Sequence, residues 1–210
     1  MSKIKHISFD LDGTLIDSLP IMKVAWESSM VALNHNCHFS EYKKHIGLPF
    51  PRILELLHLS SFEKDLSKLY FSHTKRLAGD VKTFYGVDDV FNWVSKIGIS
   101  TSIITSKPRE NAEFLCDKLN ITADLLVCGD DHRNGKPNAF VADKVLKNFD
   151  VLPSEVLYVG DMVVDFQFAL NTGMRFIFFN GNGLNRIPDN IVNEIDTISC
   201  LTDLMSWPHS

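Results

Sequence analysis

Residues 4–18 read Ile-Lys-His-Ile-Ser-Phe-Asp-Leu-Asp-Gly-Thr-Leu-Ile-Asp-Ser, and this stretch decides the fold. Its mainly apolar start, Ile4 to Phe9, predicts a buried β-strand. Asp10 and Asp12 follow, and side chains two residues apart on a strand point the same way, so one site is expected to hold both carboxylates. Gly13 allows a sharp turn close to a ligand. Two neighbouring carboxylates indicate a hard metal such as Mg²⁺ or an acid/base pair, although Asp-x-Asp-Gly alone also occurs in solvated turns.

The longer pattern in residues 10–18, Asp-x-Asp-Gly-Thr-Leu-x-Asp-Ser, resembles the first motif of the haloacid dehalogenase superfamily of phosphotransferases. This resemblance implies three further motifs: a Ser or Thr after a second core strand, then a lysine, then an acidic pair after a later strand. The matches, in chain order, are Thr105-Ser106 after a predicted strand 99–105, Lys136 in Gly135-Lys136-Pro137, and Asp161 with Asp165 after a predicted strand 156–159. Four motifs in this order cover nearly the whole chain.

The resemblance also implies roles for these residues. Asp10 is expected to be the nucleophile that forms an aspartyl phosphate. Asp12 is expected to protonate the leaving oxygen and then to activate water. Thr105 is expected to donate its hydroxyl to a phosphoryl oxygen, with Ser106 beside it in the phosphate-binding loop. Lys136 is expected to balance the charge of Asp10 and of the phosphate, as phosphoryl transfer requires.

The same resemblance implies a Mg²⁺ site, because the candidate ligands are all oxygens. Its expected members are Asp10, Asp12 through its backbone carbonyl, Asp161 and Asp165. Asp165 is expected in the coordination sphere or directly behind it; the alternative is an ordinary helix carboxylate. Lys107 and Arg133 lie in nearby loops and are alternatives to Lys136.

Alternation of predicted strands and helices, among them helices 87–97 and 138–149 and strand 175–179, indicates an α/β fold, a Rossmann-like parallel sheet wrapped by helices. In such sheets ligands bind beyond the carboxyl ends of the strands. Between 18 and 82, however, nearly every periodic segment reads as helix, with Ser18 expected to cap the first. By the resemblance, this insertion is a small helical cap that closes over the site on two linkers, near residues 15–18 and 82–86. The expected domains are a discontinuous core, residues 1–16 and 84–210, and a cap, residues 17–83.

Residues of the predicted cap are expected to select the substrate. The stretch 45–52, His-Ile-Gly-Leu-Pro-Phe-Pro-Arg, resembles the cap loop of phosphoglycolate phosphatase-like members. Such a loop is expected to bring Arg52, Lys44 or His45 to the end of the substrate away from the phosphate, and Arg52 would suit a carboxylate. The alternative for Arg52 is a surface residue at the start of a helix.

Composition limits the partners of the chain. Its 210 residues are 45% apolar with a net charge of −5, which is enough for a buried core and offers no basic surplus for nucleic acid. The four cysteines, Cys37, Cys116, Cys128 and Cys200, lie far apart and predict reduced thiols in a cytoplasmic protein. No stretch predicts a signal peptide or a membrane span. A small phosphorylated metabolite is the expected partner, and the chain is expected to be a monomer or a homodimer.

Several functions compete on this scaffold. The first is a Mg²⁺-dependent, phosphoglycolate phosphatase-like enzyme that acts on small phosphate monoesters. A sugar phosphomutase is disfavoured because Met22 occupies the position where such mutases carry a histidine. A phosphonate hydrolase would need a Schiff-base lysine in the cap, such as Lys43 or Lys44. A non-catalytic phospholigand-binding relative would be expected to lack a motif carboxylate, and a dehalogenase would lack Asp12.

Overall fold

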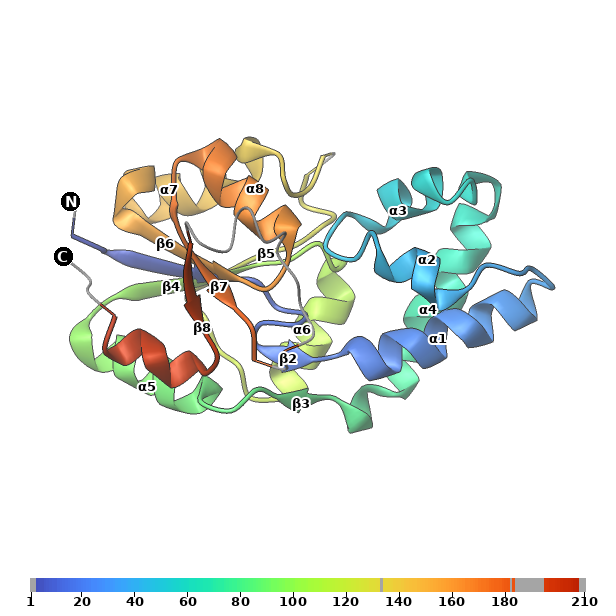
Figure 1. The fold of residues 1–210 in the computed structure, drawn as a ribbon, viewed down its shortest axis with the longest axis horizontal. Coiled ribbons are helices and arrows are strands. Elements are labelled where there is room, and N and C mark those ends of the chain that lie inside the picture. Colours follow the sequence, from blue (N-terminus) through green and yellow to red (C-terminus); the bar gives the residue numbers. More distant parts are fainter. Residues whose placement is uncertain (1–2, 133, 182, 184–194, 208–210) are drawn as a thin grey trace.

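The core is a six-stranded parallel sheet with helices on both faces (Figure 1). This computed structural model describes residues 3–132, 134–181, 183 and 195–207. Across the sheet the strands run in the order β5-β4-β1-β6-β7-β8. The strands are β1 (His6–Phe9), β4 (Ser100–Ile104), β5 (Leu125–Val127), β6 (Val156–Gly160), β7 (Arg175–Phe179) and β8 (Asp196–Ile198). Because β1 lies between β4 and β6, the carboxyl ends of these three strands form the crevice where ligands bind in such sheets.

Alternation along the strands sends side chains to two separate apolar layers. Ile7 and Phe9 of β1 join the layer beneath α5, α6 and the 3₁₀-helix η5, whereas Tyr158 of β6 joins the layer beneath α7 and α8. The helices of the core are α5 (Val87–Ile97), α6 (Arg109–Lys118), α7 (Asp143–Phe149) and α8 (Val163–Thr172). Short 3₁₀-helices complete it: η3 (Ala139–Ala142), η4 (Pro153–Glu155) and η5 (Leu201–Met205).

Residues 17–83, which we call the cap segment, fold into helices beside the sheet (Figure 1). They are α1 (Leu19–Ala32), α2 (Phe39–Lys43), α3 (Phe50–Leu56), η1 (Ser60–Phe62), α4 (Glu63–Arg76) and η2 (Ala78–Asp80). The cap segment has an apolar cluster of its own around Trp26, which is fully buried and stacks on Tyr42 with ring centroids 4.3 Å apart. This cluster explains why the segment stands as a helical body outside the sheet.

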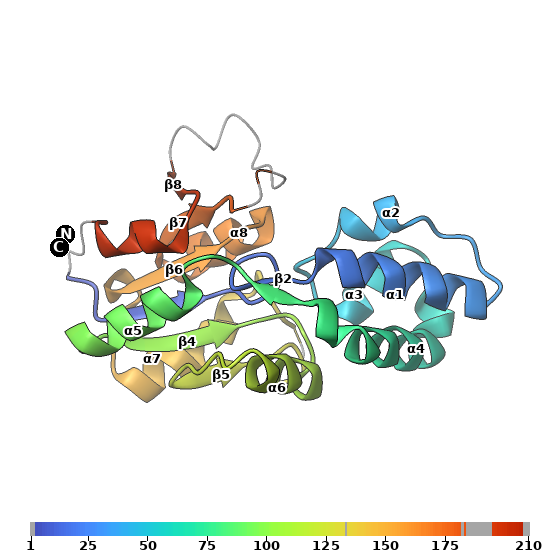
Figure 2. The same ribbon diagram turned by 90° about the horizontal axis from the view of Figure 1, so that it is seen from below.

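Two short strands connect the cap segment to the core. β2 (Ile16–Asp17) pairs antiparallel with β3 (Lys82–Thr83), Ile16 facing Thr83. Figure 2 shows this ribbon between the sheet and the cap helices. The chain therefore enters and leaves the cap segment at one point, within the two linkers that the sequence predicts. The domain boundaries themselves stay a prediction.

Most predicted elements are present with small shifts at their ends. Helix 87–97 and strand 175–179 match the prediction residue for residue. The helix predicted over 138–149 is an α-helix only from Asp143, because η3 comes first. Ser18 precedes α1 as expected, but its hydroxyl makes no capping hydrogen bond. Within the described residues, no helix is long and apolar enough to cross a membrane.

Candidate active site

The predicted motif residues meet at the carboxyl ends of three neighbouring strands. Asp10 follows β1, Thr105 follows β4 and Asp161 follows β6. Phe9 is in register with Ile103 on one side and with Val159 on the other, so Thr105 and Asp161 emerge one residue beyond the level of Asp10. All three side chains are buried. Residues separated by about 150 positions in the chain thus form one site, as the parallel topology predicts.

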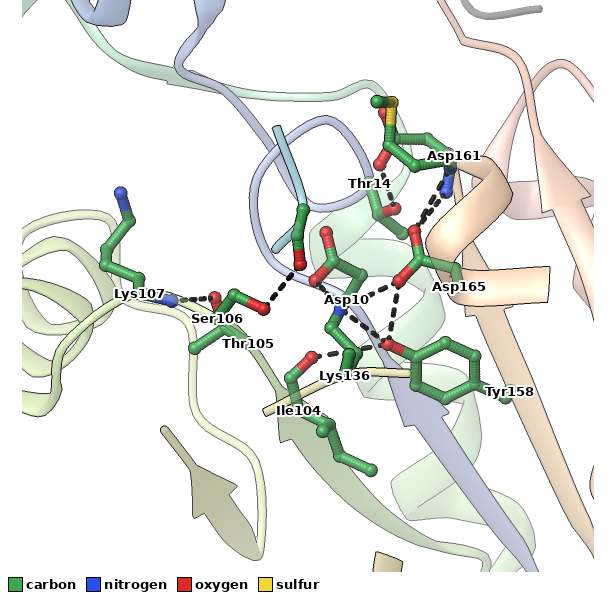
Figure 3. Close-up of polar contacts among 12 residues, drawn as sticks. Asp10, Thr14, Ile104, Thr105, Ser106, Lys107, Lys136, Tyr158, Asp161 and Asp165 are labelled. Carbon is green, nitrogen blue, oxygen red and sulfur yellow. Dashed lines mark hydrogen bonds and ion pairs between the residues drawn. The ribbon is translucent and has the colours of Figure 1, made fainter. Parts of the chain in front are cut away.

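Lys136 is the centre of this site (Figure 3). Its Nζ lies 2.5 Å from Asp10 Oδ1, 2.7 Å from Asp165 Oδ1 and 2.9 Å from the Tyr158 hydroxyl. The three acceptors use all three protons of the ammonium group. Burial alone would lower the pKa of Lys136, but the charges of Asp10 and Asp165 outweigh it and hold that pKa well above its usual range. Lys136 is therefore a fixed positive charge beside Asp10.

Three buried carboxylates lie close together at this lysine. Carboxylate oxygens of Asp10, Asp161 and Asp165 all lie within 4.8 Å of one another. Burial raises the pKa of Asp10 to about 7, although Lys136 opposes the shift. Burial and the charge of Asp10 likewise raise the pKa of Asp161 well above its usual range. A cluster with this excess of negative charge and only oxygen donors fits a hard divalent cation such as Mg²⁺.

Asp165 differs from the other two carboxylates because both of its oxygens already have protein partners. Oδ1 accepts from Lys136 and from the Tyr158 hydroxyl at 3.2 Å. Oδ2 accepts from the backbone amides of Asp161 at 3.2 Å and Met162 at 3.1 Å. These contacts suit a residue that orients its neighbours. The role predicted for Asp165, in the coordination sphere of a metal or directly behind it, stays a prediction.

Gly13 is required by the close approach of the first loop to Asp161. Its φ of +94° lies in the left-handed region, and a Cβ there would stand 2.2 Å from Asp161 Oδ2. The next residue, Thr14, donates its hydroxyl to Asp161 Oδ1 at 3.1 Å. The loop after β1 therefore holds the Asp161 carboxylate in place, which explains the glycine of the motif.

Asp12 faces a different set of partners from Asp10. Ser18 donates its hydroxyl to Asp12 Oδ1 at 2.5 Å, and Lys107 Nζ lies 3.1 Å from the same oxygen. The Lys107 side chain is only 7% exposed, so this ion pair is well shielded from water. Lys107 thus pairs with Asp12, whereas Lys136 pairs with Asp10. The other alternative to Lys136, Arg133, lies outside the described residues.

Thr105 and Ser106 have unlike environments despite being neighbours. Thr105 Oγ1 accepts a hydrogen bond from the Lys107 amide at 3.1 Å, which leaves its proton for donation to a ligand. Ser106 Oγ donates to the carbonyl of Gly47 in the cap segment at 2.5 Å. In this closed arrangement the Ser106 hydroxyl joins the core to the cap segment.

A small cavity of about 50 Å³ lies between the carboxyl ends of the strands and the cap segment. It is lined on the core side by Asp10, Asp12, Thr105, Ser106 and Lys107. Met22, which the sequence places at the position of the mutase histidine, lines it from the cap segment.

The predicted cap residues lie elsewhere. Arg52 lines a wider cleft of about 1010 Å³ next to the cavity and pairs with Glu55. Lys44 is exposed and pairs with Glu41 at 2.6 Å, and His45 is half-buried outside the cavity lining. The roles predicted for these three residues stay predictions.

Four residues of the site were not predicted as members. They are Tyr158, Thr14, Ser18 and, as a partner of Asp12, Lys107. Tyr158 carries a usable signal, since a phenol in the middle of a buried strand needs a hydrogen-bond partner. Thr14 and Ser18 belong to the first motif, but their partners depend on how the loop turns back.

Comparison with known proteins agrees with this geometry. The chain is 26% identical over 191 residues to the phosphorylated carbohydrates phosphatase of Thermotoga maritima, covering 87% of this chain and 88% of that protein. It is 30% identical over 187 residues to the pyrophosphatase PpaX of Bacillus mycoides, covering 83% of each chain. A crystal structure of a predicted phosphoglycolate phosphatase from Haemophilus somnus 129pt superposes with a TM-score of 0.84 at 17% identity, covering 98% of both chains, and shows the same fold.

The family model described as haloacid dehalogenase-like hydrolase matches residues 7–179. The match includes the cap segment and every core motif, from the strand before Asp10 to the end of β7. On this evidence the chain belongs to the haloacid dehalogenase-like hydrolase family.

Proposed function

We propose that this protein is a Mg²⁺-dependent phosphatase that hydrolyses small phosphate monoesters through an aspartyl phosphate on Asp10. The observation that carries the proposal is the buried contact between Lys136 and Asp10, next to Asp161 and facing a cavity. Membership of a hydrolase family supports it. The relatives named above also support it, because their names specify phosphorylated carbohydrates, pyrophosphate or phosphoglycolate.

Asp10 is the proposed nucleophile. Among the described residues, Lys136 is its side-chain hydrogen-bond donor and uses Oδ1, so we assign the attack on phosphorus to Oδ2. As the Oδ2–phosphorus bond forms, the bond from phosphorus to the leaving oxygen breaks, and Asp12 gives that oxygen a proton. The Asp12 carboxylate then takes a proton from water, the water oxygen bonds to phosphorus, and Asp10 leaves as a carboxylate. One ester and one water thus become one alcohol and one phosphate.

The remaining core residues hold the phosphoryl group and the cation. Thr105 donates its hydroxyl to a phosphoryl oxygen, and Lys136 balances the growing charge on that group. Ser106 stays in reach of the phosphate but in the closed arrangement serves the cap segment. Asp10, the Asp12 carbonyl and Asp161 would hold Mg²⁺, with Asp165 orienting Lys136 and the loop behind Asp161. When bound, the cation neutralises charge on the phosphoryl oxygens.

Closure of the cap segment completes the proposed site. Residues 17–83 would act as a cap and residues 1–16 with 84–210 as the core, with the β2–β3 ribbon between them. Closure would exclude bulk water from the acyl phosphate.

The alternatives on the same scaffold have less support. A mutase would need a base at the position of Met22, and a thioether is not one. Lys43, the phosphonatase candidate, does not line the cavity of about 50 Å³ but an adjoining one of about 40 Å³, which it shares with Asp12, Met22 and Asp161.

A cytoplasmic location is part of the proposal. All four cysteines are free thiols in the structure, which suits a reducing compartment. The proposal also includes a monomer or homodimer that acts on a small phosphorylated metabolite. The net charge of −5 supports the expectation that nucleic acid is not a partner.

The test is turnover of p-nitrophenyl phosphate by the purified protein with and without Mg²⁺. We expect Asp10→Asn to abolish phosphate release, because the amide keeps the shape of the side chain but is not a nucleophile. Asp161→Asn should raise the Mg²⁺ concentration needed for half-maximal activity. Turnover by folded Asp10→Asn protein would overturn the covalent mechanism. Full activity of the wild type in the presence of a metal chelator would overturn the dependence on Mg²⁺.

A further inference from the structure

The cap side of the catalytic cavity is apolar and largely aromatic. Among the described residues, the cap segment contributes no charged side chain to this cavity. Its wall includes Met22, Ile53, Phe50 and Phe71, with the rings of Phe50 and Phe71 centred 5.0 Å apart. This is the wall that faces the leaving group, because the core side holds the phosphoryl group.

The two polar side chains of this wall are hydrogen-bonded to each other. Tyr42 donates its hydroxyl to the Tyr70 hydroxyl at 2.9 Å, and both side chains are buried. Burial raises the pKa of both phenols well above their usual range, so both stay neutral. The pair therefore offers a leaving group aromatic surface and no charge.

The two lysines on the core side of the cavity are already compensated, and Lys43 lines the adjoining cavity of about 40 Å³ instead. Lys136 is held by Asp10 and Asp165, and Lys107, which lines the cavity, is paired with Asp12. A carboxylate on the leaving group would have to compete with Asp12 for Lys107. Arg52 lies in the neighbouring cleft with Glu55 as its partner.

The cavity opens towards space for a longer leaving group. Five residues line both the cavity of about 50 Å³ and the cleft of about 1010 Å³: Leu48, Phe50, Phe71, Ser106 and Pro108. Four of them are apolar. A leaving group that extends out of the cavity passes between these side chains before it reaches polar residues of the cleft.

We infer that the enzyme prefers phosphate esters whose alcohol is uncharged and apolar next to the ester oxygen, such as short alkyl or arylmethyl alcohols, over esters that carry a carboxylate or a second phosphate there. This inference rests on the proposed function. The physical reason is desolvation: a second anion in this cavity would lose its water without gaining a cation of its own, whereas carbon atoms gain contact with Phe50 and Phe71.

The experiment compares kcat/KM for benzyl phosphate, n-propyl phosphate and phosphoglycolate, which all release alkoxide-type leaving groups. We expect benzyl and propyl phosphate to exceed phosphoglycolate at least tenfold, which is about 1.4 kcal/mol. Equal or higher kcat/KM for phosphoglycolate would overturn the inference. Should none of the three be hydrolysed, the proposed function falls, and the inference is then decided by binding alone.

Calorimetry with non-hydrolysable phosphonates supplies that binding measurement. Benzylphosphonate should bind the protein with Mg²⁺ at least tenfold more tightly than phosphonoacetate, which carries a carboxylate at the corresponding place. Tighter binding of phosphonoacetate would overturn the inference whether or not turnover is seen.

A matched pair of variants tests the wall directly. Phe71 is half-buried and lines both the cavity and the cleft, so Phe71→Arg should raise kcat/KM for phosphoglycolate relative to benzyl phosphate by tenfold or more. Phe62→Arg is the control, because Phe62 is also half-buried in the cap segment but does not line the cavity. An equal change of the ratio in both variants, or none in Phe71→Arg, would count against the inference.

Discussion

At the scale of single residues, the site depends on two lysines that contact different carboxylates. Lys136 contacts Asp10 and Lys107 contacts Asp12, so each carboxylate of the first motif has its own cation. From the sequence, both lysines were candidates for the same role. The contact of Lys136 with Tyr158 and Asp165 explains why Lys136 is the one fixed beside Asp10.

Tyr158 is expected to act as a positioning residue for Lys136. Tyr158→Phe removes one of three acceptors of the ammonium group, and a hydrogen bond to a charged group contributes about 1.5–3 kcal/mol. We therefore expect kcat for p-nitrophenyl phosphate to fall about tenfold or more, with a smaller change in KM. Steady-state kinetics measure both.

The control for Tyr158→Phe is Thr101→Val, which also removes a buried hydroxyl from the sheet. The Thr101 hydroxyl contacts Asp124 at 3.1 Å, away from the site. It should lower the free energy of unfolding without changing kcat. An unchanged kcat in Tyr158→Phe, or an equal loss in both variants, would assign Tyr158 a purely structural role.

At the scale of elements, sequence patterns identified those that are long or strongly periodic. Helix 87–97 was predictable because its valines repeat on one face, and Gly98 ends it in a left-handed conformation. The helix α2 has five residues and β8 has three, with one buried, so neither contains enough of a period to be recognised. The ribbon β2–β3 joins residues about 65 apart through two-residue strands, and only the folded chain brings these together.

The same distinction holds for the site. Asp10, Thr105, Lys136 and Asp161 were predictable because each follows a recognisable strand or belongs to a motif of fixed spacing. The partners of Asp12 were not, because Lys107 reaches it only after β4 has paired with β1. The contact of Ser106 with Gly47 likewise joins the core to the cap segment and has no signal in the local sequence.

Between β1 and β4 lies a buried polar network that predicts the acid sensitivity of the core. His6 Nδ1 lies 2.7 Å from Ser100 Oγ, and its Nε2 lies 2.9 Å from Ser102 Oγ. Burial lowers the pKa of His6 to about 4 from 6.5. Between these two pH values only the unfolded chain binds a proton at this histidine. The free energy of unfolding should therefore fall by about 3 kcal/mol as the pH drops from 6.5 to 4.

Denaturant unfolding measured at a series of pH values tests this expectation. His6→Asn should remove the part of the pH dependence that belongs to the histidine, whatever its effect on stability at pH 7. The control His58→Asn changes an exposed histidine of the cap segment and should leave the slope unchanged. The same slope in wild type and His6→Asn would show that other groups cause the acid sensitivity.

At the scale of the whole molecule, the loop 45–50 of the cap segment fits against the core at three points. The Gly47 carbonyl accepts a hydrogen bond from the Ser106 hydroxyl, and a Cβ on Gly47 would lie 2.4 Å from Val164 Cγ1. Pro49 meets Gly135 one residue before Lys136, where a Cβ on Gly135 would lie 2.5 Å from Pro49 Cγ. Closure of the cap segment thus depends on backbone contacts at glycines, next to the residues proposed to hold the phosphate.

Gly47→Ala is expected to keep the cap segment from closing. The φ of Gly47 is +97°, and an added Cβ would stand 2.4 Å from Val164 Cγ1, so the loop has to move away from the core. Without closure, water reaches the site and the substrate is held less well, and kcat/KM should fall tenfold or more. Small-angle X-ray scattering should show a larger radius of gyration.

Gly79→Ala is the matched control, since its Cβ meets open space in the same segment. Wild-type kinetics and scattering for Gly47→Ala would contradict this expectation. They would mean that the loop accommodates the added Cβ while the cap segment stays closed.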